Sequence, residues 1–173
     1  MTTAPPVLTS LDDLLDRLRD LTARPGRTIL GITGPPGAGK STLTDLLLPR
    51  LREDPPAGLG EGGVGHLPMD GFHLADVQLD RLGNRHRKGA PDTFDVDGYV
   101  AALTRLHEQP GRTLYAPGFE RDLEQPLAAA IAIEPSVRFV LTEGNYLLYA
   151  DQGWERVRPL LAETWYVGLA PEL

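Results

Sequence analysis

Apolar residues recur along the chain with two spacings, one typical of helices and one typical of buried strands. In residues 8–22 one helical face carries four leucines: Leu11, Leu14, Leu15 and Leu18. Ser10 stands where an N-cap belongs, so this segment is predicted to be a helix. The sequence predicts further helices in three segments: residues 41–51, 96–108 and 154–163.

Short apolar runs without the helical spacing are predicted to be strands. They cover residues 28–33, about 64–69, 137–144 and 164–169, with shorter candidates in 112–119 and 128–135. Apolar strands that alternate with helices indicate a parallel sheet covered on both faces. We therefore expect an α/β fold of three layers with a mostly parallel sheet, and a single domain over residues 1–173.

The bulk composition narrows the functional classes. The chain contains no cysteine, which excludes disulfides and thiolate metal sites and fits a cytoplasmic protein. Its net charge of −7 argues against a general nucleic-acid binder. It has no apolar run of about 18 residues and no secretory signal, so no membrane partner is expected. The oligomeric state stays open, a homodimer included.

A glycine-rich segment, GPPGAGKS at residues 34–41, fits the phosphate-loop pattern G-x-x-x-x-G-K-[ST]. It follows the predicted strand 28–33 and precedes a predicted helix, the context that this pattern needs. Glycines let backbone N–H groups surround an anion, the lysine supplies a cation for the phosphates, and the serine hydroxyl can bind Mg²⁺. ATP is therefore expected to contact Gly34, Pro35, Pro36, Gly37, Ala38, Gly39, Lys40, Ser41 and Thr42.

Two acids follow apolar runs and are candidates for catalysis. Asp70 and Glu143 should lie at the carboxyl edge of the sheet, where open α/β sheets bind their ligands. Phosphoryl transfer needs a carboxylate that deprotonates the attacking hydroxyl, and we assign that role to Asp70. Glu143 is expected to hold Mg²⁺ together with Ser41. The alternatives are an Asp-Gly turn at Asp70 and a capping acid at Glu143.

Five segments in this order resemble the phosphoribulokinase/uridine kinase family of P-loop kinases, which includes bacterial pantothenate kinase. They are GITGPPGAGKST, PMDGFHL, RKGAPDTFDVDGY, YAPGFERDLEQP and LTEGNYLL. The resemblance is greatest to a bacterial nucleoside/nucleotide kinase-like branch that includes fructose-transport-system kinases. It implies a nucleoside-kinase-like sheet in which the loop strand lies beside the strand ending in Glu143, with Asp70 as base and Lys40 as phosphate clamp.

The same resemblance implies an acceptor pocket and a lid. The acceptor side would include Arg87, Lys88, Asp92, Phe94, Tyr115 and Arg121. Residues 81–88 form the densest basic cluster, for which a solvated loop is the alternative, and His73 and His86 are either substrate contacts or ordinary surface or core histidines. Family members continue into an arginine-bearing lid, and we expect this chain, which stops at Leu173, to lack it.

The expected function is transfer of the γ-phosphoryl group of ATP, with Mg²⁺, to a hydroxyl group of a small metabolite. A sugar, a nucleoside and a pantothenate-like alcohol all remain open as acceptors. Two alternatives are a nucleotide-binding module with impaired catalysis and a P-loop hydrolase that activates water. The acceptor-side segments argue against the hydrolase, because a water nucleophile needs no such pocket.

Overall fold

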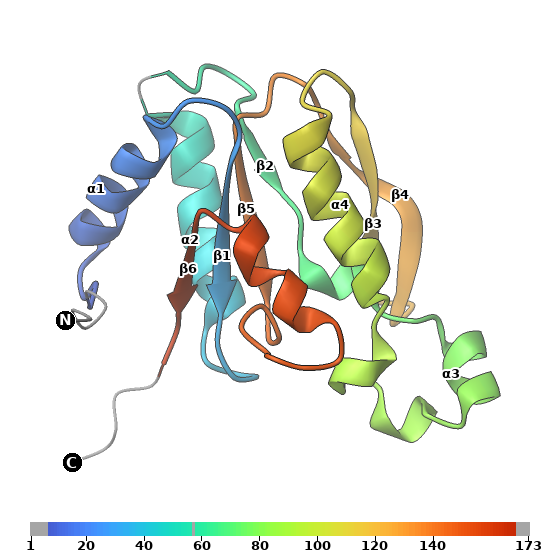
Figure 1. Ribbon diagram of the computed structural model, residues 1–173. Coiled ribbons are helices and arrows are strands. Elements are labelled where there is room, and N and C mark those ends of the chain that lie inside the picture. The colour runs from blue at the N-terminus through green and yellow to red at the C-terminus, as the bar shows by residue number, and fades with distance from the viewer. Residues whose placement is uncertain (1–6, 57, 169–173) are drawn as a thin grey trace, which may run out of the picture.

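A four-stranded sheet, in which all neighbouring strands are parallel, forms the centre of the computed structural model, which describes residues 7–56 and 58–168 (Figure 1). Its strands are β1 (Thr28–Thr33), β2 (Val64–His66), β5 (Phe139–Gly144) and β6 (Glu163–Tyr166), in the order β2-β5-β1-β6. β1 pairs with β5 along its whole length, with Thr28 opposite Phe139. The predicted neighbourhood of the loop strand and the strand carrying Glu143 is confirmed.

Side chains of alternate strand positions enter two separate cores, one on each face of the sheet. Leu30 and Ile32 of β1 pack against α1 (Leu11–Thr22) and α2 (Lys40–Glu53). Ile29 and Val140 face the opposite side, in a core with α4 (Val96–Glu108). Since both faces of the sheet are covered, the predicted three-layer α/β fold is confirmed.

Two of the predicted strands lie outside the parallel sheet, which corrects our expectation. β3 (Leu114–Glu120) and β4 (Gln125–Ile133) pair antiparallel in a sheet of their own. The physical reason is the connection: residues 121–124 alone join the two strands, whereas a parallel pair needs a crossover of about a dozen residues. The hairpin packs against the chain that follows β2, and so forms a wall beside the sheet (Figure 1).

Local sequence signals give the observed bounds of one helix and one strand. The predicted helix 96–108 coincides with α4, and the predicted strand 28–33 coincides with β1. Ser10 caps α1 as expected, since its hydroxyl accepts a hydrogen bond from the Asp13 N–H at 3.1 Å. Within the predicted strand 164–169 the structure forms β6, and residue 169 lies outside the described residues.

Two predicted elements are wrong, and each contains a proline. The segment 154–163 is not an α-helix but two short 3₁₀ turns, Trp154–Arg156 and Arg158–Leu160, and Pro159, which lacks an N–H and restricts its predecessor, stands at the start of the second. β2 ends at His66 rather than near residue 69. Leu67 still donates to the Leu141 carbonyl at 2.9 Å, and Pro68 cannot continue the pairing.

The polar stretch between β2 and α4 folds into short elements beside the hairpin. It contains a 3₁₀ turn at Met69–Phe72, the helix α3 (Asp76–Leu82), and 3₁₀ turns at Arg85–Arg87 and Pro91–Thr93. In Figure 1 this region extends from the end of the sheet, away from α1. Among residues 7–56 and 58–168, no helix is long and apolar enough to cross a membrane.

Candidate active site

The phosphate loop connects β1 to α2 through a tightly curled backbone. Gly39, the N-cap of α2, has a φ of 92°, a conformation that favours glycine. Gly34 has no room for a side chain, since a Cβ there would lie 2.3 Å from the Val167 carbonyl oxygen just beyond β6. The loop therefore stands at the carboxyl end of β1 and opens toward the N-terminus of α2, where an anion is favoured.

Lys40 is buried at the first position of α2, and its side chain folds back over the loop. Its Nζ atom donates to the Pro35 carbonyl at 2.9 Å. Burial lowers the pKa of Lys40 below its ordinary value, and the negative charges of Glu143 and Asp70 oppose that shift. The two predicted acids are thus near enough to act on the predicted phosphate-binding cation.

Glu143 lies in β5 opposite Ile32, one residue before the strand ends. Thr44 of α2 donates its hydroxyl to Oε2 at 3.3 Å, and His66 of β2 places Nε2 3.6 Å from Oε1. Burial raises the pKa of Glu143, but the nearby imidazole of His66 and the hydroxyls of Ser41 and Thr44 lower it further, so the net direction is downward. The carboxyl group is therefore ionised at neutral pH.

This arrangement fits Mg²⁺, a cation that prefers oxygen ligands. Ser41 and Glu143 would offer a hydroxyl and a carboxylate from neighbouring elements. In the described part of the chain, no cluster of three or more His, Cys, Asp or Glu side chains could hold a metal by itself. The remaining ligands would come from water and nucleotide phosphates, as is usual for Mg²⁺.

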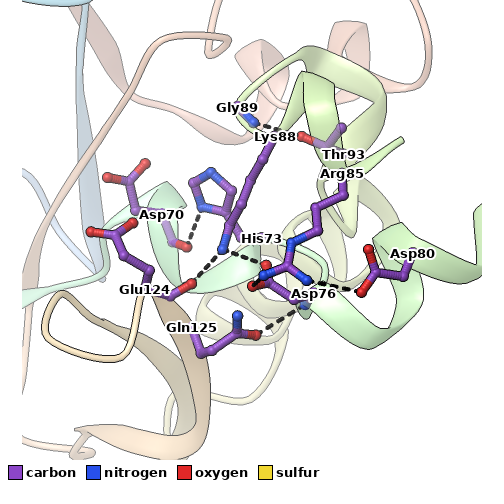
Figure 2. Close-up of polar contacts among 10 residues, drawn as sticks. All are labelled: Asp70, His73, Asp76, Asp80, Arg85, Lys88, Gly89, Thr93, Glu124 and Gln125. Atoms are coloured by element: carbon purple, nitrogen blue, oxygen red, sulfur yellow. Dashed lines mark hydrogen bonds and ion pairs between the residues drawn. The ribbon is translucent and has the colours of Figure 1, made fainter. Parts of the chain in front are cut away.

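Asp70 lies in the 3₁₀ turn after β2 and not at the strand end. Its backbone carbonyl accepts hydrogen bonds from His73, from the ring Nδ1 at 2.8 Å and from the backbone N–H at 3.2 Å. Gly71 packs so tightly on the hairpin that a Cβ would lie 2.2 Å from the Pro117 carbonyl oxygen. In Figure 2 the contact drawn to Asp70 ends on its carbonyl, and its carboxylate is turned away from that contact.

His73 connects the turn that carries Asp70 to two aromatic rings. Its ring centroid lies 4.0 Å from that of Phe94 and 4.9 Å from that of Phe119. Burial lowers the pKa of His73, so the ring is neutral at pH 7. Because a carbonyl only accepts, its Nδ1 carries the proton that is donated to Asp70.

Lys88 joins three segments around this turn. Its Nζ donates to Asp76 Oδ1 of α3 at 2.7 Å and to the Glu124 carbonyl of the hairpin (Figure 2). The same Nζ lies 5.7 Å from the centroid of the Phe119 ring. The Asp76 N–H also donates to Gln125 Oε1 at 3.0 Å, which adds a second link to the hairpin. Lys88 is thus held by partners within the protein.

The other predicted acceptor-side residues lie in different surroundings. Phe94 is buried against His73, and Arg87 forms an exposed ion pair with Asp92 at 2.9 Å. Tyr115 is 63% exposed between the buried Leu114 and Ala116, so it points away from the core. Arg121 is exposed where the hairpin turn begins. The structure brings Phe94 and Lys88 together around His73, but not Tyr115.

Sequence reasoning missed two neighbours of Glu143. Thr44 stands three residues after Ser41, so both hydroxyls lie on one helix face, and that spacing could have revealed it. His66 comes to Glu143 through the register of β2 on β5, for which the sequence carries no local signal.

No protein-family model matches the chain. It is 36% identical over 153 residues to a Schizosaccharomyces pombe protein named "Putative uridine kinase", covering 86% of this chain and 63% of that protein. It is 33% identical over 112 residues to "ATP-dependent kinase-like protein notR'" of Aspergillus versicolor, covering 61% of this chain and 65% of that protein. The chain thus spans less than two thirds of the length of either curated relative.

A solved structure is similar over most of the chain. The crystal structure of a "putative fructose transport system kinase" from Silicibacter sp. TM1040 superposes with a TM-score of 0.78 at 31% identity. The alignment covers 91% of this chain and 74% of that one. The similarity therefore extends over most of the fold that carries the candidate site.

Proposed function

The chain belongs to the phosphoribulokinase/uridine kinase family of P-loop kinases, and on that premise we propose that it transfers the γ-phosphoryl group of ATP to a hydroxyl group of a small metabolite. The observation that carries the proposal is the position of Lys40, whose ammonium group lies over the phosphate loop and interacts electrostatically with the carboxylates of both Asp70 and Glu143. A cation for the phosphates, a carboxylate base and a carboxylate for the metal are the groups that phosphoryl transfer requires.

Each group has a distinct role in the proposed reaction. The loop N–H groups and Lys40 bind the phosphates. Asp70 accepts the proton of the acceptor hydroxyl while the oxygen of that hydroxyl forms the new bond to the γ-phosphorus. The bond from the γ-phosphorus to the bridging oxygen breaks, so ADP leaves with the electron pair. Ser41 and Glu143 would hold Mg²⁺, which neutralises charge on the phosphates when bound.

The acceptor would enter beside the 3₁₀ turn of Asp70. Support for this comes from His73 and Phe119, whose partly exposed rings lie 4.9 Å apart beside that turn, with the ring of His73 bonded to the Asp70 carbonyl. Sugars, nucleosides and pantothenate-like alcohols all carry a free hydroxyl that Asp70 could deprotonate. These three classes of compound are the candidate acceptors.

The experiment follows phosphate from γ-labelled ATP into D-fructose, uridine and pantothenate, and measures inorganic phosphate in the same samples. A kinase gives labelled acceptor with little free phosphate. Release of phosphate that is independent of every acceptor would contradict the proposal and favour an NTP hydrolase. Tight binding of ATP with no turnover would instead indicate a nucleotide-binding module.

A further inference from the structure

The ring nitrogen Nε2 of His66 is buried and has no hydrogen-bond partner among the described residues. Its charged neighbour is Glu143, whose Oε1 atom lies 3.6 Å away, a distance too long for a hydrogen bond. Buried polar atoms without partners are rare in proteins, and each calls for an explanation such as a water or an ion that completes the site. The position of this atom beside an acid of the candidate site suggests one.

The pairing of β2 with β5 places the imidazole of His66 on the same face of the sheet as Glu143. β2 pairs parallel with β5, and His66 lies opposite Leu141. Successive side chains of a strand point to opposite faces, so Glu143, two residues beyond Leu141, lies on the same face as His66. β2 ends at His66, and the backbone N–H of the next residue, Leu67, makes the last hydrogen bond to β5.

The two oxygens of the Glu143 carboxylate face different neighbours. Oε2 accepts the hydroxyl of Thr44 at 3.3 Å, and Oε1 faces Nε2 of His66. One side of the carboxylate is therefore fixed by α2, while the other meets a donor that is close but not bonded. A water molecule, or a small shift of the carboxylate toward the ring, would complete the hydrogen bond.

We propose that His66 is a positioning residue for the metal side of the site, its Nε2–H group donating to Glu143 or to a water of the hydration shell of Mg²⁺. This inference rests on the proposed function, because it assumes that Ser41 and Glu143 hold the ion. Mg²⁺ in kinase sites keeps several waters, and residues that hydrogen-bond its ligands set their orientation. Loss of such an outer partner typically weakens metal binding about 10- to 100-fold.

The test measures ADP binding by calorimetry in a magnesium titration and again in EDTA, so no acceptor is needed. With ADP bound, the His66→Leu protein should bind Mg²⁺ about tenfold or more weakly than the wild type. Its affinity for ADP in EDTA should be unchanged. His107→Leu, which removes an exposed histidine on α4, serves as the matched control and should change neither quantity.

Two further variants keep the test decisive if His66→Leu does not fold. His66→Gln retains an amide N–H near the position of Nε2 and should keep most of the magnesium affinity, whereas the shorter His66→Asn should lose it. Equal magnesium titrations of the wild type and of every His66 variant would overturn the proposal. So would equal losses of ADP affinity with and without magnesium, since these indicate a structural role.

Failure of this inference is distinct from failure of the proposed function. A wild-type protein that binds ADP with a clear magnesium dependence, yet phosphorylates no acceptor, contradicts the kinase proposal and leaves the role of His66 in metal binding intact. A wild-type protein that binds no nucleotide in either condition overturns both.

Discussion

At the scale of single residues, Lys40 has two competing partners. Its ammonium group donates to the Pro35 carbonyl in the loop, and a bound nucleotide would offer phosphate oxygens in place of that carbonyl. Burial lowers the pKa of its ammonium group, and the negative charges of Glu143 and Asp70 oppose that shift. The residue thus closes the loop in the free protein and is ready to bind an anion.

Replacement of Lys40 by alanine is expected to weaken Mg·ATP binding and to abolish transfer. The loss should be roughly 10- to 100-fold in affinity, because hydrogen bonds to charged groups contribute about 1.5–3 kcal/mol. Calorimetry measures it, with Arg50→Ala on the exposed side of the same helix as the control. An unchanged ATP affinity in Lys40→Ala would place the nucleotide elsewhere.

Replacement of Asp70 by asparagine separates the roles of base and turn residue. We expect turnover to fall roughly 10²- to 10⁴-fold, while nucleotide affinity and folding stay near the wild-type values. Asparagine suits the turn as well as aspartate does, and the bonds to His73 use the backbone carbonyl. Near-normal turnover, once an acceptor is known, would show that Asp70 acts only in the turn.

The residues of the phosphate loop could be identified from sequence, whereas their surroundings could not. GPPGAGKS is a local pattern whose chemistry depends on neighbouring residues of one segment. The contacts of Lys88 with Asp76 and Glu124, and of Glu143 with His66, join segments that are distant in the chain. Such contacts follow from strand register and hairpin packing, which no spacing within a segment encodes.

At the scale of elements, one ion pair fastens the first helix to the last described strand. Arg17 of α1 donates from Nε to both carboxylate oxygens of Glu163 in β6, at 3.0 and 3.1 Å. The guanidinium of Arg17 holds the pKa of Glu163 below its ordinary value, although burial acts in the opposite direction. The pair therefore couples the stability of the edge of the sheet to pH.

The sign of this coupling follows from the lowered pKa of Glu163. A carboxyl group whose pKa is depressed in the folded state stabilises the protein above its unfolded pKa of about 4.3. That contribution is lost as the pH falls through the folded-state value. We expect Arg17→Leu to destabilise the protein by about 1 kcal/mol or less at neutral pH, and by much less in acid.

Urea unfolding of the wild type and Arg17→Leu at about pH 7 and about pH 3 measures that difference. Arg19→Leu is the control, because Arg19 pairs with Asp16 on the same helix and both side chains are largely exposed. A destabilisation by Arg17→Leu that stays equal at both pH values would indicate lost packing in place of the ion pair.

Prediction of the elements succeeded where local patterns decide and failed near two prolines and where a partner strand decides. β1 and α4 have their predicted limits because apolar spacing and capping are local. Pro68 ends the pairing of β2, but a proline alone does not decide a helix, because Pro49 lies inside α2 whereas no α-helix forms around Pro159. The pairing of β3 with β4 depends on their short connection more than on their apolar content.

At the scale of the whole molecule, the phosphate loop directly follows β1, the strand that lies between β5 and β6 in the sheet. Binding at the loop should therefore stabilise the complete fold. ADP with Mg²⁺ at about 100 times its Kd should add about 2.7 kcal/mol to the free energy of unfolding. For a chain of this length, that corresponds to a rise in Tm of roughly 5–10 °C.

Thermal unfolding with and without Mg·ADP measures this stabilisation. Lys40→Ala at the same ADP concentration is the control, and its Tm should rise much less because its affinity is lower. If saturating Mg·ADP leaves the Tm of the wild type unchanged, the nucleotide does not bind the folded sheet through this loop.

The strand order also decides when the protein can fold during synthesis. β1 emerges early from the ribosome, but its hydrogen-bonding partners are β5, with Phe139 opposite Thr28, and β6, with Glu163 opposite Leu30. Both edges of this apolar strand stay unpaired while most of the chain is made, and unpaired apolar edges favour aggregation. Non-local parallel pairing is also slow. A nucleotide can therefore stabilise the fold only after β5 and β6 have paired with β1, and a chaperone that shields the unpaired strand until then is expected to raise the folding yield.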